Sequence, residues 1–351
     1  MQTKIVVLKD IAVQADEIAM AGNILRSGGL VAFPTETVYG LGANGLDAQA
    51  SAGIYDAKGR PSDNPLILHI ADRAMLDMIA AEVPEMAEKL LAAFCPGPIT
   101  LIMKRQAVVP LRITGGLDTV GIRMPDNDIA RALIRSAGVP IAAPSANISG
   151  RPSPTTAQAV YRDMQGRIPL ILDGGPCRFG VESTIVDCTG EVAVVLCPGA
   201  ITLEMLQEVL GQVRLDPALV GADTVPRAPG MKYTHYAPKA PLTLLEGEPD
   251  KMAVALRQQL CSLQAAGHIV GVIASQEAAA SLVDILPQEL LCVYGQQGDL
   301  RAIAANLYEA LRSFDSKPAD MLLAEGTSDA GLGLAVMNRL HKASGFRSIH
   351  I

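Results

Sequence analysis

The stretch Pro34-Thr35-Glu36-Thr37-Val38-Tyr39-Gly40-Leu41-Gly42 decides the fold of this chain, because it sets polar groups between apolar, strand-like runs. It is followed by Lys58-Gly59-Arg60-Pro61 and by Asn64-Pro65-Leu66-Ile67-Leu68-His69. Two cations, one imidazole and several hydroxyl or amide groups thus lie between runs that are typical of buried strands. In a protein with a formal net charge of −7, this concentration predicts a local anion site.

Lys58 and Arg60 stand two residues apart, directly after a helix predicted from Asp47 to Ala57. Because Pro61 cannot continue a helix, we expect both cations on a loop where they converge on one anion. Arginine binds an anion as a bidentate fork and lysine as a point charge. An isolated Lys-x-Arg is most often a solvated turn, but the strand predicted at Leu66 to Ile70 follows at once and holds this loop rigid.

Further polar groups follow or precede other predicted strands. Ser145 and Asn147 follow an apolar run, Arg123 ends another, and Ser183 precedes a third. Each pattern alone is common in turns, but together, at strand ends of one α/β domain, they predict a ligand crevice. An arginine there suits a carboxylate. We interpret His69 as a hydrogen-bonding group for the substrate and not as a metal ligand.

Apolar runs alternate with helical patterns over residues 1–210, which is typical of an α/β fold. Beside the helix at 47–57, helices are expected at Ala15 to Arg26 and, with Thr202 as N-cap, at Thr202 to Leu210. The expected strands are Ile5 to Leu8, Leu30 to Phe33, Leu66 to Ile70, Ile99 to Met103, Thr119 to Met124, Pro140 to Ala143, Leu170 to Asp173, Thr184 to Asp187 and Ala193 to Leu196. Several follow one another too closely for a crossover helix, so a twisted, mixed sheet is predicted.

Residues 211–240 carry prolines and glycines and no periodic run, and are predicted to be a linker. Its end, Met231 to Ala237, is rich in hydrogen-bonding groups, so we expect it to close over the bound ligand as a lid. From residue 241 to 351, strands separated by helical patterns predict a small, parallel, Rossmann-like domain. The glycines from Gly326 to Gly333 lack the spacing of a dinucleotide-binding turn.

Composition excludes several classes of function. With 3% aromatic residues and no Trp, the chain has little material for a base-stacking groove, and its acidic net charge argues against a general polyanion binder. None of its six cysteines forms a Cys-x-x-Cys pair, so we expect reduced, mostly core thiols and no metal site made by protein side chains. Neither a signal peptide nor a membrane span is predicted, so a cytoplasmic protein without membrane contact is expected.

The Lys-x-Arg and Ser-x-Asn pairs, with the stretch that begins at Pro34, resemble the signature of the YrdC-type L-threonylcarbamoyladenylate synthases. Residues 10–208 are similar to a complete YrdC-like domain, and the rest resembles the smaller C-terminal domain of the two-domain form. The resemblance implies synthesis of L-threonylcarbamoyl-AMP from L-threonine, bicarbonate and ATP, with loss of pyrophosphate. This is the first step toward N6-threonylcarbamoyladenosine in tRNA, and it implies a downstream tRNA threonylcarbamoyl transferase as a partner.

The resemblance also implies a division of the site residues. L-Threonine would be held by Thr35 or Thr37 with His69, Arg123 and Ser183. ATP, with Mg²⁺, would be held by Lys58, Arg60, Asn64, Thr119, Ala143, Ser145, Asn147 and Ser153, to which we add Tyr236 of the linker. Lys58 and Arg60 would be the catalytic residues, offsetting charge on the phosphates.

One position departs from the family, which usually has arginine where this chain has Cys197. The missing arginine puts one phosphate contact in doubt, and Lys232 is a candidate substitute. Two other interpretations stay open. One is a carbamoyltransferase of the hydrogenase-maturation type, although its zinc fingers are missing. The other is a non-catalytic RNA-binding module, for which tRNA or double-stranded RNA would be the partner.

Overall fold

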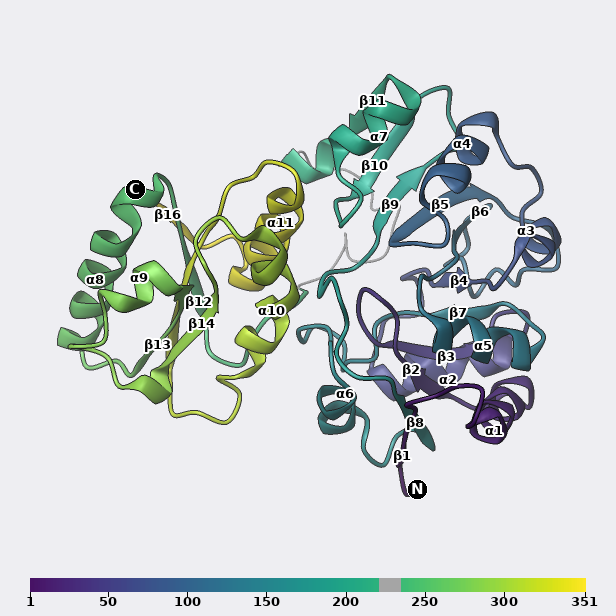
Figure 1. Ribbon diagram of the computed structural model, residues 1–351, viewed down its shortest axis with the longest axis horizontal. Helices are drawn as coiled ribbons and strands as arrows, with labels where there is room; N and C mark the ends of the chain where they lie inside the picture. Colours follow the sequence, from purple (N-terminus) through teal and green to yellow (C-terminus); the bar gives the residue numbers. More distant parts are fainter. Residues whose placement is uncertain (221–234) are drawn as a thin grey trace. The chain divides into compact units, whose positions relative to one another are not determined.

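The computed structural model describes residues 1–220 and 235–351. The described residues form two compact units. The first comprises residues 1–149 and 153–220, and the second comprises residues 150–152 and 235–351. Each unit is built on its own β-sheet (Figure 1).

The first unit contains an eleven-stranded sheet with the order β1-β8-β2-β3-β7-β4-β6-β5-β9-β10-β11. Parallel and antiparallel neighbours both occur, which confirms the predicted mixed sheet. The strands are β1 (Lys4–Val7), β2 (Val31–Phe33), β3 (Gly40–Asn44), β4 (Ile67–His69), β5 (Ile99–Lys104), β6 (Thr119–Arg123), β7 (Ile141–Ala143), β8 (Leu170–Asp173), β9 (Thr184–Asp187), β10 (Ala193–Cys197) and β11 (Val213–Leu215).

Seven α-helices of the first unit pack on this sheet (Figure 1), and most begin at the side-chain caps that favour helix starts. Asp47, Asp72, Asn127, Thr156 and Thr202 each accept a backbone N–H of the first turn. The helices are α1 (Ala15–Arg26), α2 (Ala48–Lys58), α3 (Arg73–Ile79), α4 (Glu85–Phe94), α5 (Asp128–Ala137), α6 (Ala157–Met164) and α7 (Leu203–Leu210), followed by the 3₁₀ turn η1 (Pro217–Val220).

The centre of the sheet brings distant segments together. β4 pairs with β6 in parallel, so that His69 lies opposite Arg123. On its other side β4 pairs antiparallel with β7, which sets Ile67 opposite Ala143. Three of the segments predicted to carry site residues therefore lie on adjacent strands.

Two details differ from the sequence-based expectations. Lys58 is the last residue of α2, not a loop residue, and Gly59 ends the helix in the left-handed conformation at φ 62°. The first sheet also continues past residue 210, because Val213–Leu215 pairs in parallel with β10 as the edge strand β11. Pairing with a distant strand thus organises a segment that has no periodic pattern of its own.

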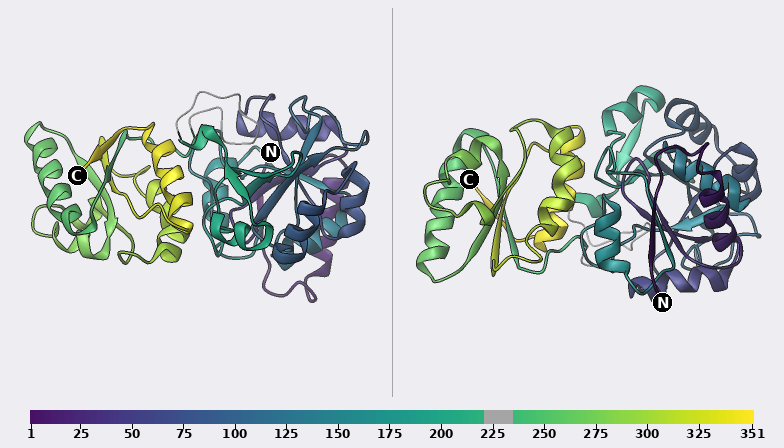
Figure 2. Two further views of the ribbon diagram at one scale, coloured as in Figure 1. Left: turned by 90° about the horizontal axis from the view of Figure 1, so that it is seen from above. Right: turned by 60° about the horizontal axis from the view of Figure 1, so that its bottom comes forward.

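The second unit has a five-stranded parallel sheet with the order β14-β13-β15-β12-β16, as the predicted Rossmann-like domain requires. Helices cover both faces of it, with α8 and α9 on one side and α10 and α11 on the other (Figures 1 and 2). The elements are β12 (Leu242–Glu246), α8 (Pro249–Ala265), β13 (Val270–Ser275), α9 (Gln276–Ala280), η2 (Gln288–Leu290), β14 (Leu291–Gly295), α10 (Leu300–Arg312), β15 (Met321–Glu325), α11 (Leu332–Ser344) and β16 (Ser348–His350).

Two further sequence-based expectations concern the lid and membrane-spanning helices. Of the lid predicted at Met231 to Ala237, residues 231–234 lie outside the described residues, as does Lys232. The lid therefore stays a prediction. Over residues 1–220 and 235–351, no helix is long and apolar enough to cross a membrane.

Candidate active site

A buried ion pair lies at the centre of the site. Arg123, at the end of β6, places Nη2 2.7 Å from Oε1 of Glu36, and the two side chains are only 5% and 2% exposed. The N–H of this contact is not aligned as a hydrogen bond. Within the described parts of the chain, Arg123 Nε and Nη2 and both carboxylate oxygens of Glu36 have no hydrogen-bond partner. The pair is thus held by charge and leaves hydrogen-bonding capacity unused.

His69 lies beside Arg123 on β4 and is buried. Burial, and then the nearby Arg123 guanidinium, lower the pKa of His69 to about 3. The imidazole is therefore neutral at neutral pH. Its Nδ1 lies 3.3 Å from the carbonyl of Ile67, a contact in which the nitrogen is the donor, and its ring meets Phe33 edge-on at 6.0 Å.

Thr35 and Thr37 flank Glu36 and are fully buried. Their hydroxyl oxygens lie 2.8 Å apart, and the Thr35 hydroxyl donates to the Val38 carbonyl at 2.7 Å. The carbonyls of Glu36 and Thr37 accept the N–H groups of Phe179 and Gly180. These backbone bonds hold the loop before β9 against the stretch that carries Glu36.

Ser183, at the end of that loop, is buried with its hydroxyl 2.7 Å from that of Thr100 on β5. Thr35, Thr37, His69, Arg123 and Ser183 thus come from four segments that the sheet and the 179–180 backbone bonds bring together. They are the residues that the resemblance assigns to L-threonine.

Lys58 is 1% exposed, and its ammonium group donates to the carbonyls of Ser145 at 2.5 Å and Asn147 at 2.6 Å. The Ser145 hydroxyl in turn donates to Asn147 Oδ1 at 2.5 Å. Gly40 of β3 forms a bridge to Ser145, which ties this turn to the quoted stretch. Lys58 therefore fixes the Ser-x-Asn turn in addition to any role toward a ligand.

Arg60 is half-buried and reaches a different segment. Its guanidinium donates to the carbonyls of Asn64 at 3.4 Å and Pro65 at 3.1 Å. Asn64 is itself buried and lies just before β4. Lys58 thus contacts the 145–147 turn and Arg60 contacts its own loop, and the convergence of the two cations on one anion stays a prediction.

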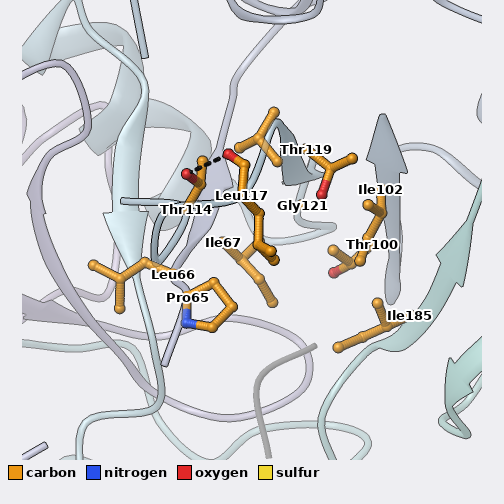
Figure 3. Close-up of a pocket in the computed structure, with 11 residues that line it drawn as sticks. Pro65, Leu66, Ile67, Thr100, Ile102, Thr114, Leu117, Thr119, Gly121 and Ile185 are labelled. Atoms are coloured by element: carbon orange, nitrogen blue, oxygen red, sulfur yellow. Dashed lines mark hydrogen bonds between the residues drawn. The ribbon is translucent and has the colours of Figure 1, made fainter. Parts of the chain in front are cut away.

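A hollow opens beside β4, β5, β6 and β9, and its lining is mostly apolar (Figure 3). Ile67, Ile102 and Ile185 line it together with the hydroxyl-bearing Thr100 and Thr119. It therefore lies between Thr100, the partner of Ser183, and Thr119, which the resemblance assigns to ATP. Ala143 is buried on the adjacent strand β7, where it pairs with Ile67 of β4.

The last two predicted nucleotide residues lie elsewhere in the chain. The Ser153 hydroxyl is buried and donates to Glu182 Oε1 at 2.5 Å, next to Ser183. Tyr236 belongs to the second unit, has φ 65°, and packs its ring on Tyr308 with centroids 5.1 Å apart. The assignment of Tyr236 to ATP stays a prediction.

The described residues also include two cysteines with raised pKa values. Burial raises the pKa of Cys95 to about 11 and that of Cys177 to about 12, so these thiols are protonated at neutral pH and poor nucleophiles. Over residues 1–220 and 235–351, no group of three His, Cys, Asp or Glu side chains could hold a metal ion. The site is thus built from neutral donors, buried cations and one buried carboxylate.

Comparison with known proteins gives the family. Residues 23–199 match the Sua5, YciO and YrdC family, described as Telomere recombination, and residues 201–345 match the family described as Threonylcarbamoyl-AMP synthase, C-terminal domain. The threonylcarbamoyl-AMP synthase of Bacillus subtilis is 48% identical over 345 residues, which are 98% of this chain and 97% of that protein. The chain belongs to the threonylcarbamoyl-AMP synthase family.

Two further comparisons support the assignment. The threonylcarbamoyl-AMP synthase of Pyrococcus abyssi is 50% identical over 338 residues, covering 95% of this chain and 96% of that protein. The crystal structure of P. abyssi Sua5 complexed with L-threonine matches with a TM-score of 0.93 at 47% identity, covering 99% of this chain and 100% of that chain. The resemblance read from the sequence is confirmed, and the synthase is favoured over the RNA-binding module and the hydrogenase-maturation type of carbamoyltransferase.

Cys197, the departure from the usual synthase pattern, is buried in a small apolar cluster with Ile102, Ile185 and Leu196. Ile102 and Ile185 of this cluster also line the hollow. A buried cysteine thus lies where most synthases of this family are expected to have an arginine.

Three residues that contact the predicted site residues have no role in the sequence-based prediction. They are Glu36, Thr100 and Glu182. Their roles come from tertiary contacts with Arg123, Ser183 and Ser153. For Glu36 a signal was present, since a carboxylate beside a buried apolar run needs a cationic partner.

Proposed function

We propose that this synthase makes L-threonylcarbamoyl-AMP from L-threonine, bicarbonate and ATP, and releases pyrophosphate, at the site centred on Arg123 and Lys58. Family membership gives the reaction, which is the first step of N6-threonylcarbamoyladenosine formation in tRNA. The observation that carries the site assignment is the open hydrogen-bonding capacity of buried Arg123. A carboxylate that binds its Nε and Nη2 would complete it.

For L-threonine, we assign the carboxylate to Arg123 and the surrounding polar contacts to Thr35, Thr37, His69 and Ser183. The P. abyssi relative was crystallised with this amino acid, and we carry the substrate over to this chain. The neutral His69 fits this role, because it can exchange hydrogen bonds without repelling either the ligand's ammonium group or Arg123.

For ATP, we assign the groups around the hollow and the Ser-x-Asn turn. Lys58, Ser145 and Asn147 form one hydrogen-bonded unit, while Arg60 and Asn64 form the next loop along the sheet. Thr119, Ala143, Ser153 and Tyr236 complete the assignment. Lys58 has three ammonium donors, so a phosphate oxygen could replace one carbonyl.

The reaction requires positioning and charge stabilisation. The neutral amine of threonine attacks the carbon of bicarbonate, and a C–O bond breaks to release water and leave a carbamate. The carbamate oxygen then attacks the α-phosphorus of ATP, and the bond to pyrophosphate breaks. No protein nucleophile enters this scheme, consistent with the raised pKa values of the Cys95 and Cys177 thiols. Buried cations in a site shielded from water stabilise developing charge far better than exposed ones.

Mg²⁺ and the downstream partners stay predictions. Mg²⁺ is usually bound by one or two carboxylates together with substrate phosphates, and the donors assigned to ATP here are cations, amides and hydroxyls. These residues alone do not form a metal site, so the metal would belong to the nucleotide. The product is expected to pass to a tRNA threonylcarbamoyl transferase, and tRNA itself is a weaker candidate partner.

Arg123→Lys tests the assignment. Lysine keeps the charge opposite Glu36 but loses the fork that can bind a carboxylate with two parallel bonds. We expect the dissociation constant for L-threonine, measured by calorimetry, to rise at least about tenfold, a loss of about 1.4 kcal/mol, while ATP binding changes little. The matched control is Arg73→Lys, at an exposed arginine paired with Asp77 and Glu88. Equal weakening of both ligands, or of neither, would contradict the proposal.

A further inference from the structure

The ion pair between Glu36 and Arg123 is incomplete in a way that points to a ligand. Both side chains are buried, yet their closest contact of 2.7 Å is not an aligned hydrogen bond. Buried polar atoms in folded proteins almost always have hydrogen-bond partners, and each exception needs an explanation. Here four atoms of two oppositely charged groups are without such partners in the part of the chain that the structure describes.

A purely structural role does not explain this buried pair, because removing both charges from water costs free energy that the single contact does not recover. An ion pair taken out of water is compensated only when further hydrogen bonds satisfy its remaining donors and lone pairs. Arg123 lacks an acceptor at Nε and Nη2, and Glu36 lacks a donor at both oxygens. The missing partners are therefore an anion at one side of the pair and a cationic donor at the other.

An amino-acid zwitterion supplies both partners at once. Its carboxylate fits the Nε and Nη2 edge of Arg123, and its ammonium group offers three donors to the Glu36 carboxylate. The titratable neighbours His69, Cys95 and Cys177 are uncharged near neutral pH. In this described cluster, Glu36 is therefore the group with the charge to bind an ammonium.

We propose that Glu36 binds the α-ammonium group of L-threonine, and that in the empty site it serves as the counter-ion of Arg123. This inference rests on the proposed function, in which Arg123 binds the substrate carboxylate. When threonine binds, its carboxylate takes the place of the Glu36 carboxylate at Arg123. Its ammonium group then becomes the counter-ion of Glu36. The pair thus selects for an amino acid over a hydroxy acid of the same shape. The hydroxy acid displaces Glu36 from Arg123 but has no ammonium group to compensate the negative charge of Glu36.

The test compares two ligands by calorimetry on the full chain. L-Threonine carries carboxylate, hydroxyl and amine, whereas 3-hydroxybutanoate keeps the carboxylate and hydroxyl but has no amine. Glu36→Gln keeps the size of the side chain, removes its charge and turns an amide toward the ligand. We expect this variant to bind L-threonine at least tenfold more weakly than the wild type, while its affinity for 3-hydroxybutanoate stays the same or rises.

Equal changes for the two ligands, or unchanged threonine binding, would overturn the assignment of Glu36. If Glu36→Gln does not fold, as judged by circular dichroism, the wild type decides. It should bind threonine at least tenfold more tightly than 3-hydroxybutanoate, and equal affinities would overturn the proposal. Arg123→Lys separates the two hypotheses. If it weakens both ligands while Glu36→Gln does not discriminate between them, only the Glu36 assignment fails. If it weakens neither, the proposed carboxylate site fails.

Discussion

Lys58, a predicted site residue, also holds parts of the fold together. Its ammonium group is buried and donates to two backbone carbonyls of the 145–147 turn. The lysine was identified as a site residue from the sequence because it stands in a Lys-x-Arg pair between apolar runs. Its partners could not be predicted, because residues 58 and 145–147 meet only when the sheet is assembled. The contact between Glu36 and Arg123 could not be predicted for the same reason.

Lys58→Met should separate these two roles. The apolar stem is kept, but two buried carbonyls lose a donor, which costs about 1–3 kcal/mol in the free energy of unfolding. Loss of a charged donor that acts in the transition state should lower the rate of synthesis by about 10²- to 10³-fold. Urea unfolding and pyrophosphate release measure the two effects. Lys89→Met, at an exposed lysine paired with Glu85, is the control and should change neither. A rate within about threefold of wild type would show that Lys58 is structural only.

The buried His69 should make the free energy of unfolding depend on pH. Its folded pKa of about 3 lies below the unfolded value of 6.5, so the unfolded chain binds more protons between these values. The contribution of His69 to the free energy of unfolding is therefore fully present above pH 6.5 and is lost as the pH falls toward 3. At pH 4.5 the loss should be about 2 to 3 kcal/mol.

His69→Gln, which does not titrate, should lack this part of the acid destabilisation. Urea unfolding at pH 7.5 and pH 4.5 measures it, and the difference between the two pH values should be smaller in the variant by about that amount. An identical difference in both proteins would mean that His69 is not a buried neutral imidazole.

At the scale of the elements, the sequence predicts strands well where apolar, β-branched residues form a run. β4, β5, β6, β8 and β9 lie within a residue or two of their predicted positions. β3 was missed because Gly40-Leu41-Gly42 has low strand propensity, and β11 because its three residues pair with the distant β10. The sequence-based prediction also lacks helices α3 to α6, although Asp72, Asn127 and Thr156 cap the starts of α3, α5 and α6.

Gly59 ends α2 and sends the chain from Lys58 to Arg60. It has φ 62°, and its position leaves open space for a methyl group. Gly59→Ala should therefore be destabilising through backbone conformation alone, by about 1 kcal/mol. The control is Gly190→Ala, at a glycine that also has free space but no positive φ, where a small gain of stability is expected. Thermal unfolding of both variants measures the contrast. A Gly59→Ala protein as stable as Gly190→Ala would show that the left-handed turn is not required.

At the scale of the whole molecule, the alternation of strands and helices was sufficient to predict two α/β units. The parallel order of the second sheet follows from strands separated by helices, since parallel neighbours need crossover connections. The order of the eleven strands in the first sheet could not be read from the chain. It depends on pairings such as β1 with β8 and β5 with β9, which join segments more than 80 residues apart. The predicted site residues lie where such pairings meet. Most of them can be predicted individually, but their contacts, and the parts played by Glu36, Thr100 and Glu182, cannot.

The most direct test of the synthase assignment is mass spectrometry of the product made by the full chain. The protein is incubated with ATP, L-threonine and ¹³C-bicarbonate, and pyrophosphate is measured in parallel. We predict threonylcarbamoyl-AMP that carries one ¹³C atom, one pyrophosphate for each product molecule, and no pyrophosphate when threonine is omitted. Pyrophosphate release that does not depend on threonine, or a reaction without the labelled product, would contradict the account.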